Sequence, residues 1–548
     1  MEACCTTRQQ SAILQVEGIT CPSCASQVEK ALATVDGVQS AVVDLAHKQA
    51  TVIYDAEKTH PDTLASVVSD AGYPSHILTG DGHRQHLVII GGGSAAFSAA
   101  LKANELGATV TLINDGLPIG GTCVNVGCVP SKTLIRAAEA HYRANHHHFQ
   151  GIEGTSRVTD FKSIIQQKTE LVENLRQAKY TDVVSDLPNF RYITGTGKFI
   201  SSDTVEVNGE RVKADKVLIA TGAAPSIPPI PGLETCNYLT NETAFELNEL
   251  PESLIVLGGR YVALELAQMF ARLGTKVTVL QRSSRILPSE TADLTDELTR
   301  YLQDEGIQVV TGATLTHAQS SNGLITITAR VNHEETTFAA SHLLVATGRR
   351  PNTTGLGLEN AGVDLDENGF LKVDDTLRTT VSHIYGAGDV IGGYQFVYTA
   401  AYEGALAAEN ALTGANRRQD YTALPWVIFT DPQVAGVGLD EKQAKEQGME
   451  ADVAVLPLSY VPRSLAARDT RGFIKLIRDK HTDQLIGARI LASEGGELLM
   501  EVALAIKFGI TVTQLISTFH PYLTLSEGIK LAAITFGKDV NKLSCCAS

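Results

Sequence analysis

The sequence is poor in cysteine, in basic residues and in long apolar runs, and each shortage excludes a class of protein. Nine cysteines in 548 residues are too few for a disulfide scaffold. Lysine and arginine number 45 against 61 acidic residues, and the formal net charge of −16 disfavours binding to a nucleic-acid backbone. No stretch approaches the roughly 20 apolar residues that span a bilayer. The first residues lack the apolar segment of a secretion signal, so we expect a cytoplasmic protein.

What the chain does contain is sufficient for several folded domains. At roughly 150 residues per domain, its length corresponds to three or four of them. Hydrophobic residues make up 43% and charged residues 19%, which excludes disorder as the main state. Apart from Cys236, the cysteines fall in close pairs, which in a reducing compartment indicate metal or redox chemistry before structural bridges. The pairs are Cys4/Cys5, Cys21/Cys24, Cys123/Cys128 and Cys545/Cys546.

Residues 11–78 predict a small module with the element order βαββαβ, the ferredoxin-like arrangement. Apolar periodicity indicates strands at 13–19, 41–45, 50–55 and 75–78, and helices at 23–35 and 61–73. Cys21 and Cys24 stand where the first strand turns into the first helix, and two thiolates there can reach one soft cation.

A lone C-x-x-C pair also fits half a zinc site, a thioredoxin-type redox pair or chance. No second C-x-x-C follows at zinc-finger spacing, and the strand order differs from that of thioredoxin, so we favour the soft metal. The module resembles the heavy-metal-associated domains of copper chaperones, P-type ATPases and mercury-reducing flavoenzymes.

After a polar linker at 79–86, two apolar strands end in glycine and lead into helices, which predicts two dinucleotide-binding βαβ units. In the first unit Gly91, Gly93 and Ala96 form the pattern G-x-G-x-x-A, which lets a pyrophosphate approach the helix N-terminus. The next strand ends in Asn114 and Asp115, and either side chain is a candidate for binding the ribose.

The second unit, at 256–265, departs from this pattern. Gly258 is present, but Arg260 and Ala263 replace the second and third glycines, so the Arg260 side chain has to turn away from the pyrophosphate. Where an acid would bind the ribose of NAD, the chain has Gln281 followed by Arg282 and Arg285. Arginine favours a 2′-phosphate, which predicts NADPH as the nucleotide.

Cys123 and Cys128 lie in the run GGTCVNVGCVPSK (120–132), close after the first nucleotide motif. A disulfide there could accept two electrons and release two thiols; the alternatives are a structural bridge or a pair of buried thiols. With Gly121, Thr122 and the following Pro-Ser-Lys, the run resembles the active site of the flavin-dependent pyridine nucleotide–disulfide oxidoreductases. The resemblance covers residues 85–548.

This resemblance implies FAD and NADPH as cofactors and assigns roles to individual residues. Cys128 would face the flavin and Cys123 would be the interchange thiol. Lys132 would lie beside the flavin ring, ion-paired to Glu265. Further residues implied to contact the flavin are Thr221 and Gly222 at a chain crossover, Asp389 near the ribityl phosphate, and Tyr261 on the nicotinamide side.

The C-terminal region separates members of the family by their chemistry. Disulfide reductases carry a histidine–glutamate dyad there, but this chain has Tyr522 at the position of the histidine, five residues before Glu527. A tyrosine, with a pKa of about 10, is a poor proton shuttle at neutral pH. Together with the terminal Cys545 and Cys546 and the N-terminal module, Tyr522 makes the chain similar to the mercuric reductases.

That similarity implies NADPH-dependent reduction of Hg(II), the substrate, to elemental mercury. Cys21 and Cys24 would capture the ion. Cys545 and Cys546 of one subunit of a homodimer would pass it to the Cys123/Cys128 pair of the other, with Tyr261 and Tyr522 lining its path. Two alternatives stay open: a disulfide reductase of the same fold, of the glutathione reductase or dihydrolipoyl dehydrogenase type, and a soft-metal chaperone or sensor.

The predicted fold class is α/β, with two Rossmann-like nucleotide-binding domains, a C-terminal α+β dimerisation domain and the ferredoxin-like module in front. The predicted boundaries are a tail at 1–10, the heavy-metal-associated domain at 11–78, a linker at 79–86, the FAD-binding domain at 87–235, the NADPH-binding domain at 236–355, the second part of the FAD-binding region at 356–420, and the dimerisation domain with its Cys-Cys tail at 421–548.

Overall fold

The computed structural model describes residues 9–78 and 84–542, and these form two compact units. One unit contains the described residues up to Asn125 with Asn174–Ala224 and Arg350–Gln419; the other contains Val126–Glu173, Pro225–Arg349 and the described residues from Asp420 onward. Among the described residues, no helix is both long and apolar enough to cross a membrane.

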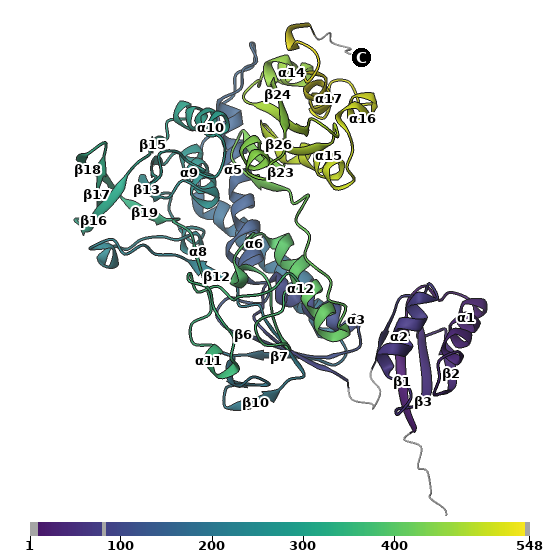
Figure 1. Ribbon diagram of the computed structural model, residues 1–548. Helices are drawn as coiled ribbons and strands as arrows, with labels where there is room; N and C mark the ends of the chain where they lie inside the picture. Colours follow the sequence, from purple (N-terminus) through teal and green to yellow (C-terminus); the bar gives the residue numbers. More distant parts are fainter. Residues whose placement is uncertain (1–8, 79–83, 543–548) are drawn as a thin grey trace, which may run out of the picture. The chain divides into compact units, whose positions relative to one another are not determined.

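The N-terminal module is a four-stranded antiparallel sheet with two helices packed on it (Figure 1). The strand order β2-β3-β1-β4 is ferredoxin-like, as predicted. The first strand is offset from the predicted 13–19, because Gly18, with φ of 78°, turns the chain before the start of α1. The elements are β1 (Gln9–Val16), α1 (Pro22–Ala33), β2 (Val38–Asp44), β3 (Gln49–Asp55), α2 (Pro61–Asp70) and β4 (Ser75–Ile77).

The first region predicted to bind a nucleotide contains a five-stranded parallel sheet in the order β21-β11-β5-β6-β7. Its central strands are apolar and buried on both faces, as parallel strands covered by helices must be. Helices α3 and α12 share one core with the sheet and approach so closely that a Cβ at Gly404 would lie 2.0 Å from the Ala95 carbonyl oxygen. The elements are β5 (His86–Ile90), α3 (Ser94–Glu105), β6 (Thr109–Asn114), β7 (Phe190–Thr194), β11 (Lys216–Ile219), β21 (Ile384–Gly386) and α12 (Val397–Thr413), with an antiparallel sheet of β8 (Lys198–Ser201), β9 (Thr204–Val207) and β10 (Glu210–Lys213).

The second region predicted to bind a nucleotide repeats this plan with a four-stranded parallel sheet in the order β15-β14-β13-β19. A three-stranded antiparallel sheet, β16-β17-β18, contributes to the same core. The elements are β13 (Ser253–Leu257), α9 (Tyr261–Leu273), β14 (Lys276–Leu280), α10 (Ala292–Asp304), β15 (Gln308–Val310), β16 (Thr314–Ser321), β17 (Leu324–Val331), β18 (Glu334–Ala340) and β19 (His342–Val345).

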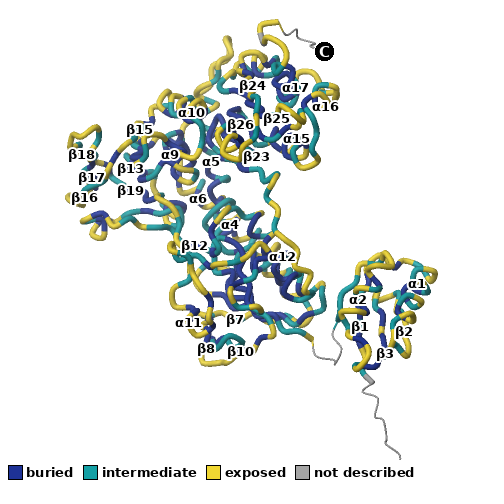
Figure 2. Tube along the Cα trace, viewed as in Figure 1, coloured by how far each residue is buried: buried dark blue, intermediate teal, exposed yellow. Residues whose placement is uncertain are grey.

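The C-terminal region is a five-stranded antiparallel sheet in the order β22-β23-β26-β25-β24, with helices packed on its apolar face. In Figure 2 the buried segments follow these strands and the helices α15 and α17. The elements are β22 (Trp426–Ile428), β23 (Gln433–Gly438), α13 (Glu441–Glu446), β24 (Ala451–Pro457), α14 (Pro462–Ala467), β25 (Phe473–Asp479), β26 (Leu485–Ala492), α15 (Gly495–Lys507), α16 (Val512–Ser517) and α17 (Glu527–Ile534).

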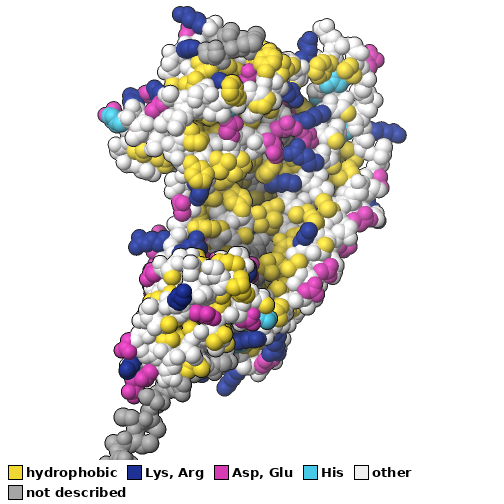
Figure 3. Space-filling view, turned by 90° about the vertical axis from the view of Figure 1, so that its right-hand side faces the viewer, with side chains coloured by type: hydrophobic (Ala, Val, Ile, Leu, Met, Phe, Trp, Pro, Cys, Tyr) yellow, Lys and Arg dark blue, Asp and Glu magenta, His cyan; other side chains and the backbone are white. Residues whose placement is uncertain are grey.

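Helices and short elements connect these sheets and carry much of the candidate site. They are α4 (Gly121–Val126), α5 (Cys128–Asn145), α6 (Phe161–Arg176), α7 (Asp182–Ser185), β12 (Ala223–Pro225), α8 (Asn241–Ala244), β20 (Arg349–Pro351), α11 (Leu358–Ala361) and a 3₁₀ turn, η3 (Asp389–Ile391). The face drawn in Figure 3 carries acidic and basic side chains interspersed with one another. The predicted α/β fold class is confirmed.

Candidate active site and metal-binding thiols

The turn between β5 and α3 leaves the first backbone amides of the helix without a side-chain cap. Gly91 has φ of 128°, and a Cβ there would lie 2.1 Å from the Ala220 carbonyl oxygen, so only glycine fits. Gly93 is the N-cap of α3 and has no side chain to occupy the amides of the first turn. Those amides are therefore available to an anion. Ala96, the third position of the motif, is fully buried beneath the turn.

Asn114 and Asp115, the two candidates for binding the ribose, have different surroundings. Asn114 is buried against Gly92, and its Nδ2 donates to the Leu117 carbonyl at 2.9 Å and to the Tyr192 hydroxyl at 3.1 Å. Asp115 is exposed and accepts hydrogen bonds from Thr196 and from the Gly116 amide. The hydrogen bond from Thr196 and the one from Gly116 lower the pKa of Asp115 below its usual value. Of the two residues, Asn114 is thus the one whose side chain lies against the glycine turn. Its Nδ2 is used as a donor, and its Oδ1 is the atom that could accept a hydrogen bond from a ribose hydroxyl.

The crossover residues lie beside a second segment of the same unit. The Thr221 hydroxyl donates to the Asn352 carbonyl at 2.7 Å, and Asn352 Nδ2 donates back to the Thr221 carbonyl at 2.9 Å. Gly222, with φ of 70°, turns the chain there. Asp389 begins η3 directly after Gly388, whose amide donates to the buried Glu403 at 2.7 Å.

Two consecutive helices carry the expected redox cysteines. Cys123 lies in α4 and Cys128 is the first residue of α5, and both thiols are partly buried. The Gly120 amide donates to the Gly92 carbonyl at 2.8 Å, which fixes the start of α4 at the glycine turn. Gly121 must be glycine, because a Cβ there would lie 2.6 Å from the Gly93 Cα. The partial positive charge at the start of α5 favours negative charge near Cys128.

Lys132 and Glu265, expected to form an ion pair, do so with an Nζ–Oε2 distance of 2.6 Å. The second carboxylate oxygen of Glu265 accepts the Phe429 amide at 2.9 Å, and the Phe429 ring lies 4.6 Å from the Lys132 ammonium. The ammonium is thus held between a carboxylate and an aromatic face, a favourable position for a cation.

The face of α9 that carries Glu265 also forms hydrogen bonds with the backbone of the segment before β23. Gln268 accepts the Asp431 amide at 2.8 Å and donates to its carbonyl at 2.9 Å. One turn further on, Arg272 bonds to Asp431 at 3.0 Å and to Glu305 at 2.6 Å.

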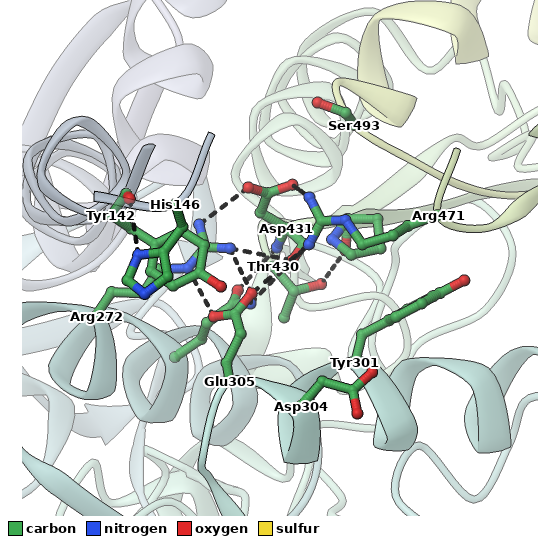
Figure 4. A network of polar contacts seen from close by, with 12 residues as sticks. Tyr142, His146, Arg272, Tyr301, Asp304, Glu305, Thr430, Asp431, Arg471 and Ser493 are labelled. Atoms are coloured by element: carbon green, nitrogen blue, oxygen red, sulfur yellow. Dashed lines mark hydrogen bonds and ion pairs between the residues drawn. The ribbon is translucent and has the colours of Figure 1, made fainter. Parts of the chain in front are cut away.

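Figure 4 shows this buried network, with Arg272 and Arg471 directed at Asp431 and Glu305. The Tyr142 ring lies 4.2 Å from the Arg272 guanidinium. Despite desolvation, the hydrogen bonds and attraction of the surrounding acids raise the pKa of both arginines, so both stay charged. These contacts fix the position of α9, and with it Glu265, relative to the C-terminal sheet.

The second glycine turn, between β13 and α9, shares only part of the first turn's construction. A Cβ at Gly258 would lie 2.3 Å from the Ala346 carbonyl oxygen, which matches the position of Gly91. Arg260 is the N-cap of α9 with φ of −111° and ψ of −169°, an extended backbone that any residue adopts, and it is exposed. Ala263 is fully buried.

The residues expected to select the nucleotide follow β14. Gln281 is buried beneath Gly259, whereas Arg282 and Arg285 are exposed. Arg285 Nε donates to Asp296 on α10 at 2.9 Å. Arg282 makes no hydrogen bond or ion pair with the described residues, so of the two it is the one open to a phosphate.

Tyr261 opens α9 and stacks on Trp426 of the C-terminal sheet, with ring centroids 5.9 Å apart and planes inclined by 15°. Tyr522, in contrast, is 53% exposed. Glu527 accepts the Leu523 amide at 3.2 Å. His520, two residues before Tyr522, bonds through Nε2 to Glu501 at 2.5 Å, and its side chain is only 4% exposed.

Cys21 and Cys24 lie at the start of α1, with their sulfur atoms 3.0 Å apart. The hydrogen bond from Cys21, a backbone hydrogen bond at Thr20 and a weaker one from Tyr73 lower the pKa of Cys24 to about 6. Cys24 is therefore mainly a thiolate at neutral pH, the form that binds soft metals. Among the described residues, no group of three or more histidine, cysteine or acidic side chains could hold a metal ion.

Several cysteines of interest lie outside the described residues, namely Cys4, Cys5, Cys545 and Cys546. Sequence reasoning missed Tyr73, Glu403, Gln268, Phe429 and Trp426. Of these, Glu403 left a signal, an acid inside the alanine-rich helix α12, and Trp426 is the only tryptophan of the chain. The others are ordinary residues whose partners lie far away in sequence.

Three family models match the chain: pyridine nucleotide-disulphide oxidoreductase over residues 85–404, the dimerisation domain of that family over 424–533, and the heavy-metal-associated domain over 13–74. Mercuric reductase of Staphylococcus aureus is 42% identical over 550 residues, 98% of this chain and 100% of that protein. Mercuric reductase of Shigella flexneri is 43% identical over 564 residues, 97% of this chain and 99% of that protein.

Among solved structures, the Cu(II) complex of the HOCl-induced flavoprotein disulfide reductase RclA from Escherichia coli is similar, with a TM-score of 0.75 and 32% identity over 83% of this chain and 100% of that one. LpdA from Mycobacterium tuberculosis has a TM-score of 0.73 and 30% identity over the same shares. The chain belongs to the pyridine nucleotide–disulphide oxidoreductase family and carries a heavy-metal-associated domain at its N-terminal end.

Proposed function

We propose that this chain is a mercuric reductase, which reduces Hg(II) to elemental mercury at the expense of NADPH. The observation that carries the proposal is the pairing of intact redox helices with a C-terminal segment that lacks a dyad for disulfide chemistry. Cys123 and Cys128 stand at the redox positions, and Tyr522 stands where disulfide reductases have their histidine. Near full-length similarity to mercuric reductases supports the same activity.

The residues of the first unit fit FAD. The uncapped amides of α3 would receive the pyrophosphate, and Asn114 Oδ1 is the acceptor nearest the glycine turn for a ribose hydroxyl. Thr221, Gly222 and Asp389 would contact the rest of the cofactor. When bound, FAD supplies two-electron chemistry between the nicotinamide nucleotide and the metal site.

The residues of the second unit fit NADPH. The amides at the start of α9 would bind its pyrophosphate, with Gly258 giving close approach and the exposed Arg260 side chain leaving it open. Arg282 would pair with the 2′-phosphate. Tyr261, at the start of the same helix, would cover the nicotinamide position.

The thiol pairs would handle the metal as substrate. Hg(II) is a soft ion that prefers two thiolates, so each pair can hold it alone. Cys21 and Cys24, with a thiolate ready at neutral pH, would capture it. Cys123 and Cys128 would bind it for reduction, and the terminal Cys545 and Cys546 would deliver it. Tyr522 would assist the exchange of ligands at the ion.

Disulfide reduction, the main alternative, needs an acid to protonate the leaving thiol. One carboxylate oxygen of Glu527 accepts a hydrogen bond from the Leu523 amide. A tyrosine hydroxyl, which Tyr522 places at the position of the histidine, is a weak acid at neutral pH. The pair of His520 and Glu501 does not replace the missing dyad, because the histidine side chain is almost fully buried.

We further propose that the protein is a homodimer assembled through its dimerisation domain. One side of α15 exposes Met500 and Leu504, the C-cap residue Phe508 directly after the helix is also exposed, and Phe519 is 98% exposed. An apolar stripe with this spacing needs a cover in water. A second copy would cover it and bring Tyr522 and the terminal cysteines to the partner's redox helices. Analytical ultracentrifugation of the full chain tests the assembly.

The activity is tested by measuring NADPH oxidation by the full protein with Hg(II) in excess thiol, together with the loss of mercury as vapour. We expect mercury-dependent turnover that is abolished in Cys128→Ala. The matched control is Cys236→Ala, which removes a buried thiol outside the site and should retain turnover. A protein that instead turns over oxidised glutathione or lipoamide at the higher rate would be a disulfide reductase.

The roles of the outer thiols are tested separately. The double variant Cys21→Ala/Cys24→Ala should keep its maximal rate and lose capture efficiency only when free thiol is scarce. Removing Cys545 and Cys546 together should abolish reduction of thiol-bound mercury while NADPH still reduces the flavin. A soft-metal chaperone, in contrast, would bind Hg(II) at Cys21 and Cys24 without any mercury-dependent oxidation of NADPH.

A further inference from the structure

Two fully buried cations lie side by side in the C-terminal sheet. Lys475 of β25 and Arg489 of β26 are paired directly across the strands and are 0% and 1% exposed. Like charges opposite one another on a sheet repel, and buried charges require partners. The pair therefore exists only because carboxylates from outside the sheet approach it.

Two of these carboxylates come from the segment 281–293, which runs from the end of β14 into the first turn of α10. Arg489 Nε donates to Glu290 Oε2 at 2.7 Å, and Lys475 Nζ lies 2.8 Å from Asp293 Oδ2. Lys475 also donates to the Thr291 hydroxyl at 2.9 Å. The other two acids, Asp440 and Glu441, start α13 within the C-terminal region itself.

The segment that these cations hold is the one expected to select the nucleotide. It begins with Gln281, Arg282 and Arg285, and the Glu290 amide donates to the Leu287 carbonyl at 2.9 Å. Leu287 is buried and has φ of 44°, a conformation that a leucine adopts only when its surroundings enforce it. The Leu287 amide in turn donates to the Gly259 carbonyl, inside the glycine turn, at 2.8 Å.

Arg489 also reaches the other side of the same site. Its guanidinium lies 5.5 Å from the Trp426 ring, and Trp426 stacks on Tyr261 at the start of α9. One cation thus supports both the segment expected to bind the 2′-phosphate and the tyrosine expected at the nicotinamide end.

We infer that Lys475 and Arg489 are positioning residues for the nicotinamide-nucleotide site: anchored in the C-terminal sheet, they hold Glu290 and Asp293 so that Arg282 meets the 2′-phosphate. The inference rests on the proposed use of NADPH and names residues that set its selectivity without touching it. Removing one of these contacts should make the segment more mobile and weaken the binding of NADP⁺ more than the binding of NAD⁺. The reaction steps after binding should be unchanged.

The test compares Glu290→Ala with the unmodified flavin-loaded protein. Calorimetric titrations give the dissociation constants of NADP⁺ and NAD⁺, and steady-state assays give KM for NADPH and kcat. We expect the NADP⁺ dissociation constant and KM to rise about tenfold, a smaller change for NAD⁺, and kcat within about twofold. Glu290→Gln, which keeps an acceptor for Arg489 Nε, should recover most of the affinity.

The control is Asp452→Ala, which removes one of the two acids that pair with Arg478 of β25, at 3.2 Å, and lies outside the segment. It should leave both dissociation constants unchanged. If Glu290→Ala lowers the melting temperature but leaves the NADP⁺-to-NAD⁺ ratio unaltered, the cations are purely structural and the inference is wrong. Should Glu290→Ala fold poorly, Asp293→Asn, at a side chain 46% exposed, replaces it with the same expected direction.

Failure of the proposed function has a different signature. An unmodified protein that binds neither NADP⁺ nor NAD⁺ would refute the nucleotide site itself. An unmodified protein that binds both nucleotides but prefers NAD⁺ would refute the role of Arg282, and the inference built on it would fall with it. An unmodified protein that prefers NADP⁺, with unchanged preference in Glu290→Ala, refutes only the anchoring by Lys475 and Arg489.

Discussion

The two glycine turns of this chain, at 91–93 and 258–260, start from the same plan and differ at one position. Both place a first glycine under a carbonyl oxygen of a neighbouring strand, where a Cβ would lie at 2.1 Å and 2.3 Å. Both helices then begin at an extended N-cap residue, but this residue is Gly93 in the first turn and Arg260 in the second. The difference separates two reasons for glycine in such motifs.

The fold requires the first glycine of each turn, because its φ is positive and a Cβ would overlap a backbone carbonyl. A second glycine is required only where another group has to approach that position closely. In the first turn the start of α4 passes over Gly93, since a Cβ at Gly121 would lie 2.6 Å from the Gly93 Cα. Arg260 instead faces solvent, so its side chain costs the fold nothing. A motif that fails at its second glycine can therefore still form the turn.

The largest expected effect is from adding a Cβ at the shared glycine of either turn. Gly91→Ala and Gly258→Ala should each lower the free energy of unfolding of their unit by about 3 kcal/mol or more, through backbone strain and overlap with a carbonyl. Urea denaturation measures this loss. Gly116→Ala, at φ of 78° with no atom near its Cβ, isolates the strain and should cost only about 1 kcal/mol. Equal losses at all three glycines would contradict the steric explanation.

The second prediction exchanges the position at which the turns differ. Gly93→Arg should still fold, because the backbone is extended and the added Cβ would meet the Gly121 Cα at an ordinary contact distance of 3.8 Å, but flavin affinity should fall at least tenfold. The absorbance of bound flavin per protein measures it. Arg260→Gly should change KM for NADPH by less than about threefold. A Gly93→Arg protein that purifies with full flavin would show that the second glycine is dispensable in both turns.

The third prediction concerns the arginines that only the second region carries. Arg282→Ala should reduce the preference for NADPH over NADH by about 1.5–3 kcal/mol, through loss of a charge-assisted hydrogen bond. Arg285→Ala should have a smaller effect, because Asp296 already holds that guanidinium. The ratio of kcat/KM for the two nucleotides measures both, and Asp296→Ala is the control. Equal losses for the two arginines would mean that Arg285 leaves Asp296 when the nucleotide binds.

The smallest expected effect is the dependence of stability on pH that Asp115 causes directly after β6. Asp115 has a lowered pKa in the folded state, so its contribution to stability is present above the unfolded pKa of about 3.9 and is lost as pH falls through the lower folded value. Asp115→Asn should therefore be less stable than the unmodified protein at pH 6 and equal to it in strong acid. Urea midpoints across this range measure the difference. Thr196→Val, which removes the main donor, should reproduce it, and a gap that persists unchanged into strong acid would rule out this carboxylate as its source.

Much of the fold followed from local pattern. Apolar runs ending in glycine identified both parallel sheets, and alternation with two helical segments identified the βαββαβ module. The offset of β1 arose because periodicity continues through residues 17–19 in sequence, whereas Gly18 has already left the strand. The redox helices and the Lys132–Glu265 pair were expected from family resemblance, since the two residues are 133 positions apart.

The supports around the site were beyond reach of the sequence. Gln268 looks like any polar residue on a helix until Asp431, 163 positions away, is folded against it. Lys475 and Arg489 would be read as surface residues of an alternating strand, yet both are fully buried. Their burial is favourable only where acids such as Glu290 and Asp293 arrive from segments far away in the sequence, and no local rule encodes that arrival.

By itself the sequence determined where the chain must turn, which segments must be buried, and which thiols and arginines it offers to metal and nucleotide. These follow from steric limits at glycine, from hydrophobic periodicity and from side-chain chemistry, all of which act over a few residues. Only the tertiary structure decided which charges meet in the interior and what holds the site residues in place. Ion pairs and stacked rings depend on distances between segments far apart in the chain, and those distances exist only after folding.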